Sequence, residues 1–163
     1  MKRGSRWWWL FLLLPWLAVA ATPDVTLPDI DGNSHRVSEF IGHGQWTVVA
    51  VWSVDCVICR RETPQLAFFH DDHKHKDARV LGIAIDGFGE RARIRAFVDE
   101  RGLSFPNLIG KRTDLFRFGT VFMGTPSYLF FSPTGELARS HVGSMTLAEV
   151  ERTVEQLNAN AKR

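Results

Sequence analysis

The chain has two cysteines, Cys56 and Cys59, and both lie in the stretch WSVDCVICRRETPQ at residues 52–65. Two thiols at this spacing can ligate a metal, form a structural disulfide or exchange disulfides with a partner. A structural zinc site takes about four Cys or His ligands, and the next histidine after Cys59 is His70. A Cys-x-x-Cys loop is also too short to constrain the unfolded chain strongly. The spacing therefore favours redox chemistry, and we predict no metal site.

The segments on either side of the cysteines predict that Cys56 begins a helix. Residues 47–52, TVVAVW, form the continuous apolar run that is typical of a strand buried on both faces, and residues 57–75 have a helical pattern. At the N-terminus of a helix, the dipole and the free N–H groups stabilise a thiolate on Cys56. Cys59, one turn later, would be shielded and placed to attack a mixed disulfide on Cys56.

The first half of the chain has the pattern of parallel strands joined by helices. Residues 79–86 repeat the apolar, β-branched character of residues 47–52, and the helical stretch 57–75 lies between them. A strand, a helix and a second strand predict parallel pairing. Residues 90–101 follow as another helix with an apolar face.

The second half changes to a hairpin. Residues 127–131 and 136–142 are two strand patterns, and residues 132–135, SPTG, place Pro and Gly where a β-turn needs them. Thr146 then begins a last helix, with Glu149 three residues on as a capping box. These strands are therefore expected to pair antiparallel.

A short hairpin around Asp31-Gly32, at residues 27–37, precedes these elements. The complete order predicts an α/β fold with a central mixed β-sheet flanked by helices and an N-terminal β-hairpin extension. Few small folds are parallel in the first half and hairpinned in the second, and the thioredoxin fold is one of them. We therefore predict a single thioredoxin-like domain.

The N-terminus has the pattern of a secretory signal at residues 1–20: three basic residues, an apolar run at 7–21 and a small-residue exit at 18–20. The apolar run is 15 residues long, whereas a membrane span needs about 20. We expect cleavage, which leaves residues 21–163 as a thioredoxin-like domain in the periplasm or another extracytoplasmic compartment. A retained membrane anchor is the alternative.

The basic charge of the chain belongs partly to this segment. The chain has 20 Lys and Arg against 18 Asp and Glu; three basic residues and no acid leave with residues 1–20, so the net charge falls from +2 to −1. A mature domain with no basic excess is not expected to bind nucleic acid.

A proline far from the cysteines adds a second feature. Pro126, in Gly124-Thr125-Pro126, comes directly before the strand 127–131, where proline is tolerated at the first residue or in a special turn. An X-Pro bond can be cis at modest cost. A cis Thr125–Pro126 bond would turn the backbone of Thr125 outward to pair with an extended substrate, whereas a trans proline would mark an ordinary turn.

Residues 52–64 resemble the active-site segment of the TlpA/ResA-type thioredoxin-like proteins, which are exported thiol:disulfide oxidoreductases, many of them anchored in the bacterial membrane. The similarity extends to residues 26–32, 124–130 and 132–136 and to Gly143 before the last helix. It covers essentially the whole chain after the signal. Cys-x-x-Cys alone is a weak motif, but its combination with the preceding Trp, Pro64 and the distant Thr-Pro is specific.

The resemblance implies a role for each matching residue. Cys56 would be the attacking thiol and Cys59 the resolving one, with Pro126 as the cis-proline beside them. We expect Trp52 and Thr125 to contact the substrate.

The resemblance also implies a role for Glu62, which matches an acidic residue that lies beneath the site and moves protons. Thioredoxin itself carries a buried Asp two residues before the Trp, but this chain has Ala50 there. Glu62 is then the candidate general base for Cys59. The alternative is a solvated helix residue.

Three residues depart from the family pattern. Asp55 stands where a bulky residue usually precedes the first cysteine, and its charge opposes a thiolate on Cys56. Val57 and Ile58 donate no side-chain hydrogen bond to that thiolate. We therefore predict a reducing pair, nearer to thioredoxin at about −270 mV than to a strong oxidase at about −120 mV.

The predicted function is that of an exported protein-disulfide reductase whose redox-active Cys56–Cys59 pair needs no further cofactor. Its partners would be a disulfide-containing client and a membrane-embedded thiol donor. The family suggests apocytochrome c or a copper-site protein as the client, which places the chain in cytochrome c biogenesis.

Other functions remain as alternatives. A Sco-type copper chaperone shares the fold and uses two cysteines with a late histidine, which would be His141, although its cysteines are usually one residue further apart. His70 and His73 could also share a helix face as metal ligands do, but a solvated helix end that leads into a loop is the favoured interpretation. Peroxiredoxins share the fold as well, but their active-site pattern has Pro where this chain has Val49, so we discount this class. A disulfide-forming oxidant is another alternative. A non-catalytic binding module is disfavoured, because such a module has no reason to keep both cysteines and the Thr125-Pro126 pair.

Overall fold

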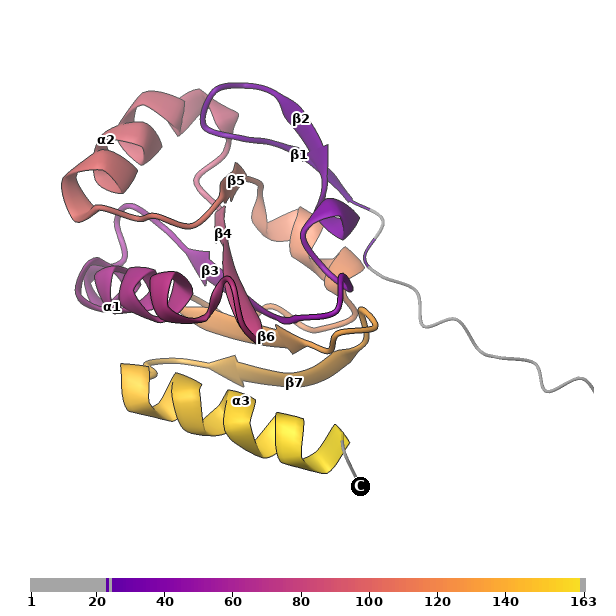
Figure 1. Cartoon of the computed structure of the whole chain (residues 1–163). Helices are drawn as coiled ribbons and strands as arrows, with labels where there is room; N and C mark the ends of the chain where they lie inside the picture. Colours follow the sequence, from indigo (N-terminus) through magenta and orange to yellow (C-terminus); the bar gives the residue numbers. More distant parts are fainter. Residues whose placement is uncertain (1–22, 24, 162–163) are drawn as a thin grey trace, which may run out of the picture.

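The computed structural model describes residue 23 and residues 25–161 (Figure 1). The predicted signal peptide, residues 1–20, lies outside the described residues. A five-stranded sheet has the order β5-β4-β3-β6-β7. Its strands are β3 (Trp46–Trp52), β4 (Ala78–Ala84), β5 (Asn107–Ile109), β6 (Ser127–Phe131) and β7 (Leu137–Val142).

The sheet is mixed, as predicted. β3 pairs parallel with β4 and antiparallel with β6, while β4 continues parallel to β5 and β6 antiparallel to β7. The predicted thioredoxin-like fold is confirmed. The strand β5 was not predicted, because three residues carry too little alternation or apolar run to be distinguished from a loop.

The helices α1 (Val57–His73), α2 (Arg91–Arg101) and α3 (Leu147–Ala161) pack their buried side chains into one hydrophobic core, on one face of β3. Figure 1 shows α1 and α2 together beside the sheet and α3 along β7. Half of the predicted capping box of α3 is present, because the Glu149 carboxylate accepts a hydrogen bond of 2.8 Å from the backbone N–H of Thr146. The Thr146 hydroxyl also donates to this carboxylate at 2.8 Å, and the Glu149 N–H bonds to the Thr146 carbonyl, not to the hydroxyl. The short 3₁₀ helices are η1 (Val37–Glu39), η2 (Phe88–Glu90) and η3 (Arg112–Phe118).

The central strand β3 is buried along its whole length. Trp46, Val48, Ala50 and Trp52 join the core beneath the three helices, whereas Val49 and Val51 join a second core with residues of β1, η1 and η3. This alternation is the period of a pleated strand. Because both faces are covered, β3 is a fixed base for the loop that follows it.

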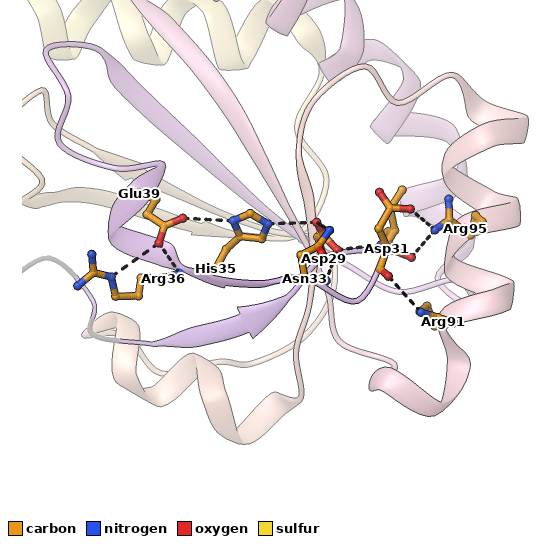
Figure 2. A network of polar contacts seen from close by, with 9 residues as sticks. Asp29, Asp31, Asn33, His35, Arg36, Glu39, Arg91 and Arg95 are labelled. Carbon is orange, nitrogen blue, oxygen red and sulfur yellow. Dashed lines mark hydrogen bonds and ion pairs between the residues drawn. The ribbon is translucent and has the colours of Figure 1, made fainter.

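The N-terminal hairpin is also confirmed. β1 (Thr26–Pro28) pairs antiparallel with β2 (Ser34–Arg36). Gly32 in the turn has a φ of 95°, a conformation that glycine adopts without a steric penalty. The Asp29 carboxylate accepts hydrogen bonds from the backbone N–H groups of Asp31 and Asn33, each at 2.8 Å (Figure 2). These bonds hold the turn closed.

The hairpin docks onto the sheet edge and onto α2. Asp29 forms an isolated antiparallel bridge with Leu108 of β5, and Arg95 of α2 pairs with the Asp31 carboxylate at 2.5 Å (Figure 2). His35 lies between Glu39 and Asp29, at 3.2 and 3.1 Å, and hydrogen bonds to these two carboxylates raise its pKa. The hairpin thus covers an edge that would otherwise expose unpaired backbone groups.

Candidate active site

The two cysteines form a disulfide where β3 passes into α1. Cys56 is the N-cap residue of α1, and its Sγ accepts a hydrogen bond of 3.1 Å from the backbone N–H of Cys59. Cys59 is fully buried, whereas Cys56 is part-exposed. An incoming thiol can therefore reach Cys56 and is shielded from Cys59, which is the asymmetry predicted for an attacking and a resolving thiol.

A carboxylate that the sequence did not reveal fixes the loop before Cys56. Asp86, just beyond the end of β4, accepts hydrogen bonds from the Ser53 hydroxyl at 2.7 Å and from the backbone N–H of Val54 at 3.2 Å. The Cys56 N–H then donates to the Ser53 carbonyl at 3.2 Å. The signal was an acidic residue at the end of a predicted strand parallel to β3, since the carboxyl ends of neighbouring parallel strands meet at one edge.

Trp52 belongs to the core and not to the substrate surface. Its side chain is fully buried, stacks on Phe97 with ring centroids 4.7 Å apart, and donates to the Asn107 side-chain carbonyl at 3.2 Å. Gly82 of β4 makes room for this arrangement, because a Cβ there would overlap with the Asn107 side chain. The prediction that Trp52 contacts the substrate does not agree with this burial, and we assign Trp52 to the support of the loop.

The Thr125–Pro126 bond is cis, as predicted. Val51 pairs with Ser127, so Pro126 lies beside the end of β3 from which the cysteine loop departs. The Pro126 carbonyl accepts a hydrogen bond of 2.9 Å from the N–H of Gly143. Thr125 is part-exposed, and its contact with a substrate stays a prediction.

Glu62 lies inside the protein, with 4% of its surface exposed. Its carboxylate accepts hydrogen bonds from the Tyr128 hydroxyl at 2.8 Å, from the Met145 N–H at 3.3 Å and from the Ser144 hydroxyl, and lies 3.7 Å from the Arg61 guanidinium. The alternative of a solvated helix residue is therefore wrong.

Tyr128 and the loop at 144–145 are the partners that sequence reasoning missed. Burial, and then the hydrogen bond to Glu62, raise the pKa of Tyr128, so it remains a hydroxyl donor. Tyr128 is on β6, 66 positions from Glu62 in the sequence, and residues 144–145 follow β7, 82 and 83 positions from it. The only sequence signal was a polar residue, Tyr128, inside an otherwise apolar strand.

Asp55 is exposed beside Cys56, but it is not alone. Its carboxylate lies 2.7 Å from Arg93 of α2, which also pairs with Glu90 at 3.0 Å. The sequence predicted that the charge of Asp55 opposes a thiolate on Cys56 with nothing to balance it. In the structure, Arg93 offsets part of that charge. Val57 and Ile58 agree with expectation, because they are exposed by 79% and 38% and bring no polar side chain to the disulfide.

The histidines considered as metal ligands have protein partners. His70 is buried and its Nδ1 accepts a hydrogen bond of 3.1 Å from the Val80 N–H, while His73 pairs with Asp77 at 2.8 Å. His141 lies 3.2 Å from the Ser144 carbonyl. Among the described residues, no three His, Cys, Asp or Glu side chains are grouped as a metal site would need.

The AhpC/TSA family pattern matches residues 19–140, which is most of the chain and includes the disulfide. The chain belongs to the AhpC/TSA family. Within that family it is similar to the thiol-disulfide oxidoreductase ResA of Geobacillus kaustophilus, with 27% identity over 143 residues that cover 86% of this chain and 79% of the relative. The predicted enzyme class, a thiol:disulfide oxidoreductase, is thereby confirmed.

Solved structures support the fold. A thiol:disulfide interchange protein of the thioredoxin family from Chlorobium tepidum superimposes with a TM-score of 0.73 at 18% identity, covering 84% of this chain and 94% of that one. MTB DsbF, in mixed oxidised and reduced forms, gives 0.69 at 23% identity, with 83% and 96% covered. Within the part of the chain that the structure describes, no helix is long and apolar enough to cross a membrane.

Proposed function

We propose that this member of the AhpC/TSA family is an extracytoplasmic reductase of protein disulfides. The observation that carries the proposal is the disulfide at the start of α1, with a part-exposed Cys56 and a fully buried Cys59. The first sulfur is open to a macromolecular partner and the second is reserved for the resolving step. No bound cofactor is needed, because the cysteine pair itself carries two electrons.

The proposed reaction has two exchanges. The Cys56 thiolate attacks a client disulfide, forming a Cys56–client bond and releasing one client thiolate. Cys59 then gives its proton to Glu62 and attacks Cys56, which forms the Cys56–Cys59 disulfide and releases the second client thiolate. The client gains two electrons, the enzyme loses two, and solvent protonates the products. A thiol donor must then reduce the enzyme.

The surroundings of Cys56 favour a reducing potential. Strong oxidants of this fold owe their potential to a stabilised thiolate. Among the described residues, Cys56 Sγ accepts a hydrogen bond from the Cys59 N–H, and neither Val57 nor Ile58 adds a side-chain donor. Asp55 opposes the thiolate, although Arg93 weakens its effect. We expect a potential nearer to about −270 mV than to about −120 mV.

The location and the partners belong to the same proposal. The signal pattern at residues 1–20 supports export, and a structural neighbour is an exposed lipoprotein thioredoxin of Streptococcus pneumoniae. An exported reductant must be reduced again by an electron donor after each turnover, since the compartment is oxidising. We propose a membrane-embedded thiol donor, and apocytochrome c or a copper-site protein as the client.

The test has two parts. The reduction potential of the full chain is measured by equilibration with glutathione and dithiothreitol at neutral pH, and a value below about −200 mV supports the reductase. A potential close to that of the strong oxidases overturns the direction of electron flow. In the second part, Cys59→Ser should accumulate mixed disulfides on Cys56, with Cys56→Ser as the control that accumulates none. Normal turnover by Cys59→Ser would refute the two-thiol mechanism.

A further inference from the structure

Glu62 takes the proton of Cys59 more readily if that proton can pass on to solvent. Glu62 follows Cys59 by three residues, so the two side chains share one face of α1. Glu62 is buried, however, with only 4% of its surface exposed. A route from this carboxylate to water lets the proton of Cys59 leave the site while Cys59 attacks, so such a route speeds the resolving step itself.

Three of the four partners of Glu62 cannot form that route. Tyr128 is 1% exposed, and its raised pKa keeps its own proton in place. The Met145 backbone N–H donates a hydrogen bond, but an amide is too weak an acid and too weak a base to pass the proton on. The Arg61 guanidinium has N–H donors and no acceptor, so it cannot receive a proton from Glu62.

Ser144 differs from these partners in two respects. Its hydroxyl donates to Glu62 Oε1, and a hydroxyl also accepts hydrogen bonds, so it can pass a proton on. Ser144 is exposed, in the loop between β7 and α3, so its other side meets water. The adjacent Met145 N–H donates to the other oxygen of the same carboxylate, which holds this loop against Glu62.

We propose that Ser144 is a positioning residue that relays the proton between Glu62 and solvent. In the oxidative direction, Cys59 loses its proton to the Glu62 carboxylate, Glu62 returns one through the Ser144 hydroxyl, and that hydroxyl releases one to water. No net charge stays in the site. This inference rests on the proposed role of Glu62 as the base for Cys59.

The experiment separates the two exchange steps. The reduced full chain is mixed in a stopped-flow instrument with an aromatic disulfide that releases a coloured thiolate. Attack by Cys56 releases the first thiolate and resolution by Cys59 releases the second. The rates of both phases are recorded against pH for the wild type and for Ser144→Ala, Ser144→Thr and Ser140→Ala. Ser140 is a matched control, because it is an exposed serine on β7 and does not belong to the residues that donate hydrogen bonds to Glu62.

Ser144→Ala should slow the second phase by about tenfold, a part of the usual general acid–base contribution, and leave the first phase unchanged. Added imidazole buffer should restore part of the lost rate, because it replaces the missing proton carrier. Ser144→Thr, which keeps a hydroxyl, and Ser140→Ala should behave as the wild type. If Ser144→Ala does not fold, Ser144→Gly removes the same hydroxyl.

Two results would overturn the relay. A second phase in Ser144→Ala with the wild-type rate and pH profile refutes it, as does an equal loss in both phases, which indicates a structural role. Glu62→Gln, measured in parallel, separates the role of Glu62 as the base from the role of Ser144 as the relay. If Glu62→Gln slows the second phase and Ser144→Ala does not, Glu62 is the base for Cys59 and Ser144 does not relay its proton. If neither variant slows it, the role of Glu62 fails as well.

Discussion

Two carboxylates flank the disulfide, and they differ in almost everything except charge. Glu62 follows Cys59 by three residues on α1, is 4% exposed and accepts three hydrogen bonds from β6 and the β7–α3 loop. Asp55 lies beside Cys56 with 71% of its side chain exposed and pairs with Arg93, which is 54% exposed. Water and salt screen charges at the surface, while a buried group interacts strongly with each neighbour. The same acidic group is thus a candidate reactant in one place and a weak modifier in the other.

The largest effect is expected from the buried member. Glu62→Gln should slow the resolving attack by Cys59 by about 100-fold, the lower end of the contribution of a positioned general base, and change the pH dependence of that step. Asp55→Asn is the matched control, since it removes the same charge at the surface. Stopped-flow measurement of the second thiolate release checks both. Equal losses in the two variants would break the comparison.

The buried carboxylate of Glu62 is also expected to matter for the stability of the fold. Glu62→Ala leaves the buried hydroxyl of Tyr128 without its acceptor, and we expect it to lower the free energy of unfolding by about 1–3 kcal/mol. Tyr128→Phe removes the donor while Glu62 keeps its other partners, and about 1 kcal/mol is expected. Urea denaturation of the oxidised proteins measures both. A larger loss in Tyr128→Phe than in Glu62→Ala would contradict the assignment of Glu62 as the centre of this cluster.

A buried histidine extends the comparison to pH. Burial, and then the charge of Lys74, lower the pKa of His70 below its usual 6.5. The unfolded chain therefore binds a proton that the folded chain resists, so this contribution to stability is present above pH 6.5 and is lost as the pH falls through the folded pKa. His70→Asn, whose side-chain oxygen can accept from the Val80 N–H in place of Nδ1, should lose this part of the pH dependence.

Thermal unfolding between neutral and mildly acidic pH tests the histidine. His75→Asn is the control, because His75 is exposed on the segment that follows α1. An unchanged pH dependence in His70→Asn, or an equal change in both variants, would assign the effect to other groups.

The smallest effect is expected from the surface pair. Asp55→Asn should lower the pKa of the Cys56 thiol, because it removes a negative charge next to the thiolate, and Arg93→Ala should raise it. Both shifts should shrink as salt is added, since exposed charges are screened within about 10 Å at 0.1 M ionic strength. Titration of the thiolate absorbance of the reduced protein measures them. Shifts that persist at high salt would show that this site is less exposed than it is in the structure.

Sequence patterns predicted the site best where one short segment contains the chemistry. Cys56 and Cys59 lie at the start of a helix because a β-branched run precedes them and a helical stretch follows, and both signals are local. The cis-proline was predictable because proline directly before a core strand has few alternatives. The hairpin turn at Gly32 was predictable for a similar reason, since the turn needs a residue that tolerates positive φ.

Prediction failed where a residue's role depends on distant parts of the chain. Trp52 was predicted to contact the substrate, yet its side chain stacks on Phe97 and donates a hydrogen bond to Asn107 inside the core. Asp55 had the appearance of an unopposed charge until α2 placed Arg93 beside it. Asp86 was visible in the sequence only as an acidic residue at the end of a predicted strand, and its hydrogen bonds to Ser53 and Val54 were not predicted.

The sequence by itself therefore determined the reactive pair, its helix and its enzyme class, because a strand, a helix start and a Cys-x-x-Cys spacing are written within about a dozen residues. Only the tertiary structure decided which groups surround that pair. The partners of Glu62 come from β6 and from the loop before α3, and antiparallel pairing of β3 with β6 and of β6 with β7 places them. Burial and hydrogen bonding depend on such long-range pairing, and they decide whether a carboxylate acts as a reactant or as a screened surface charge.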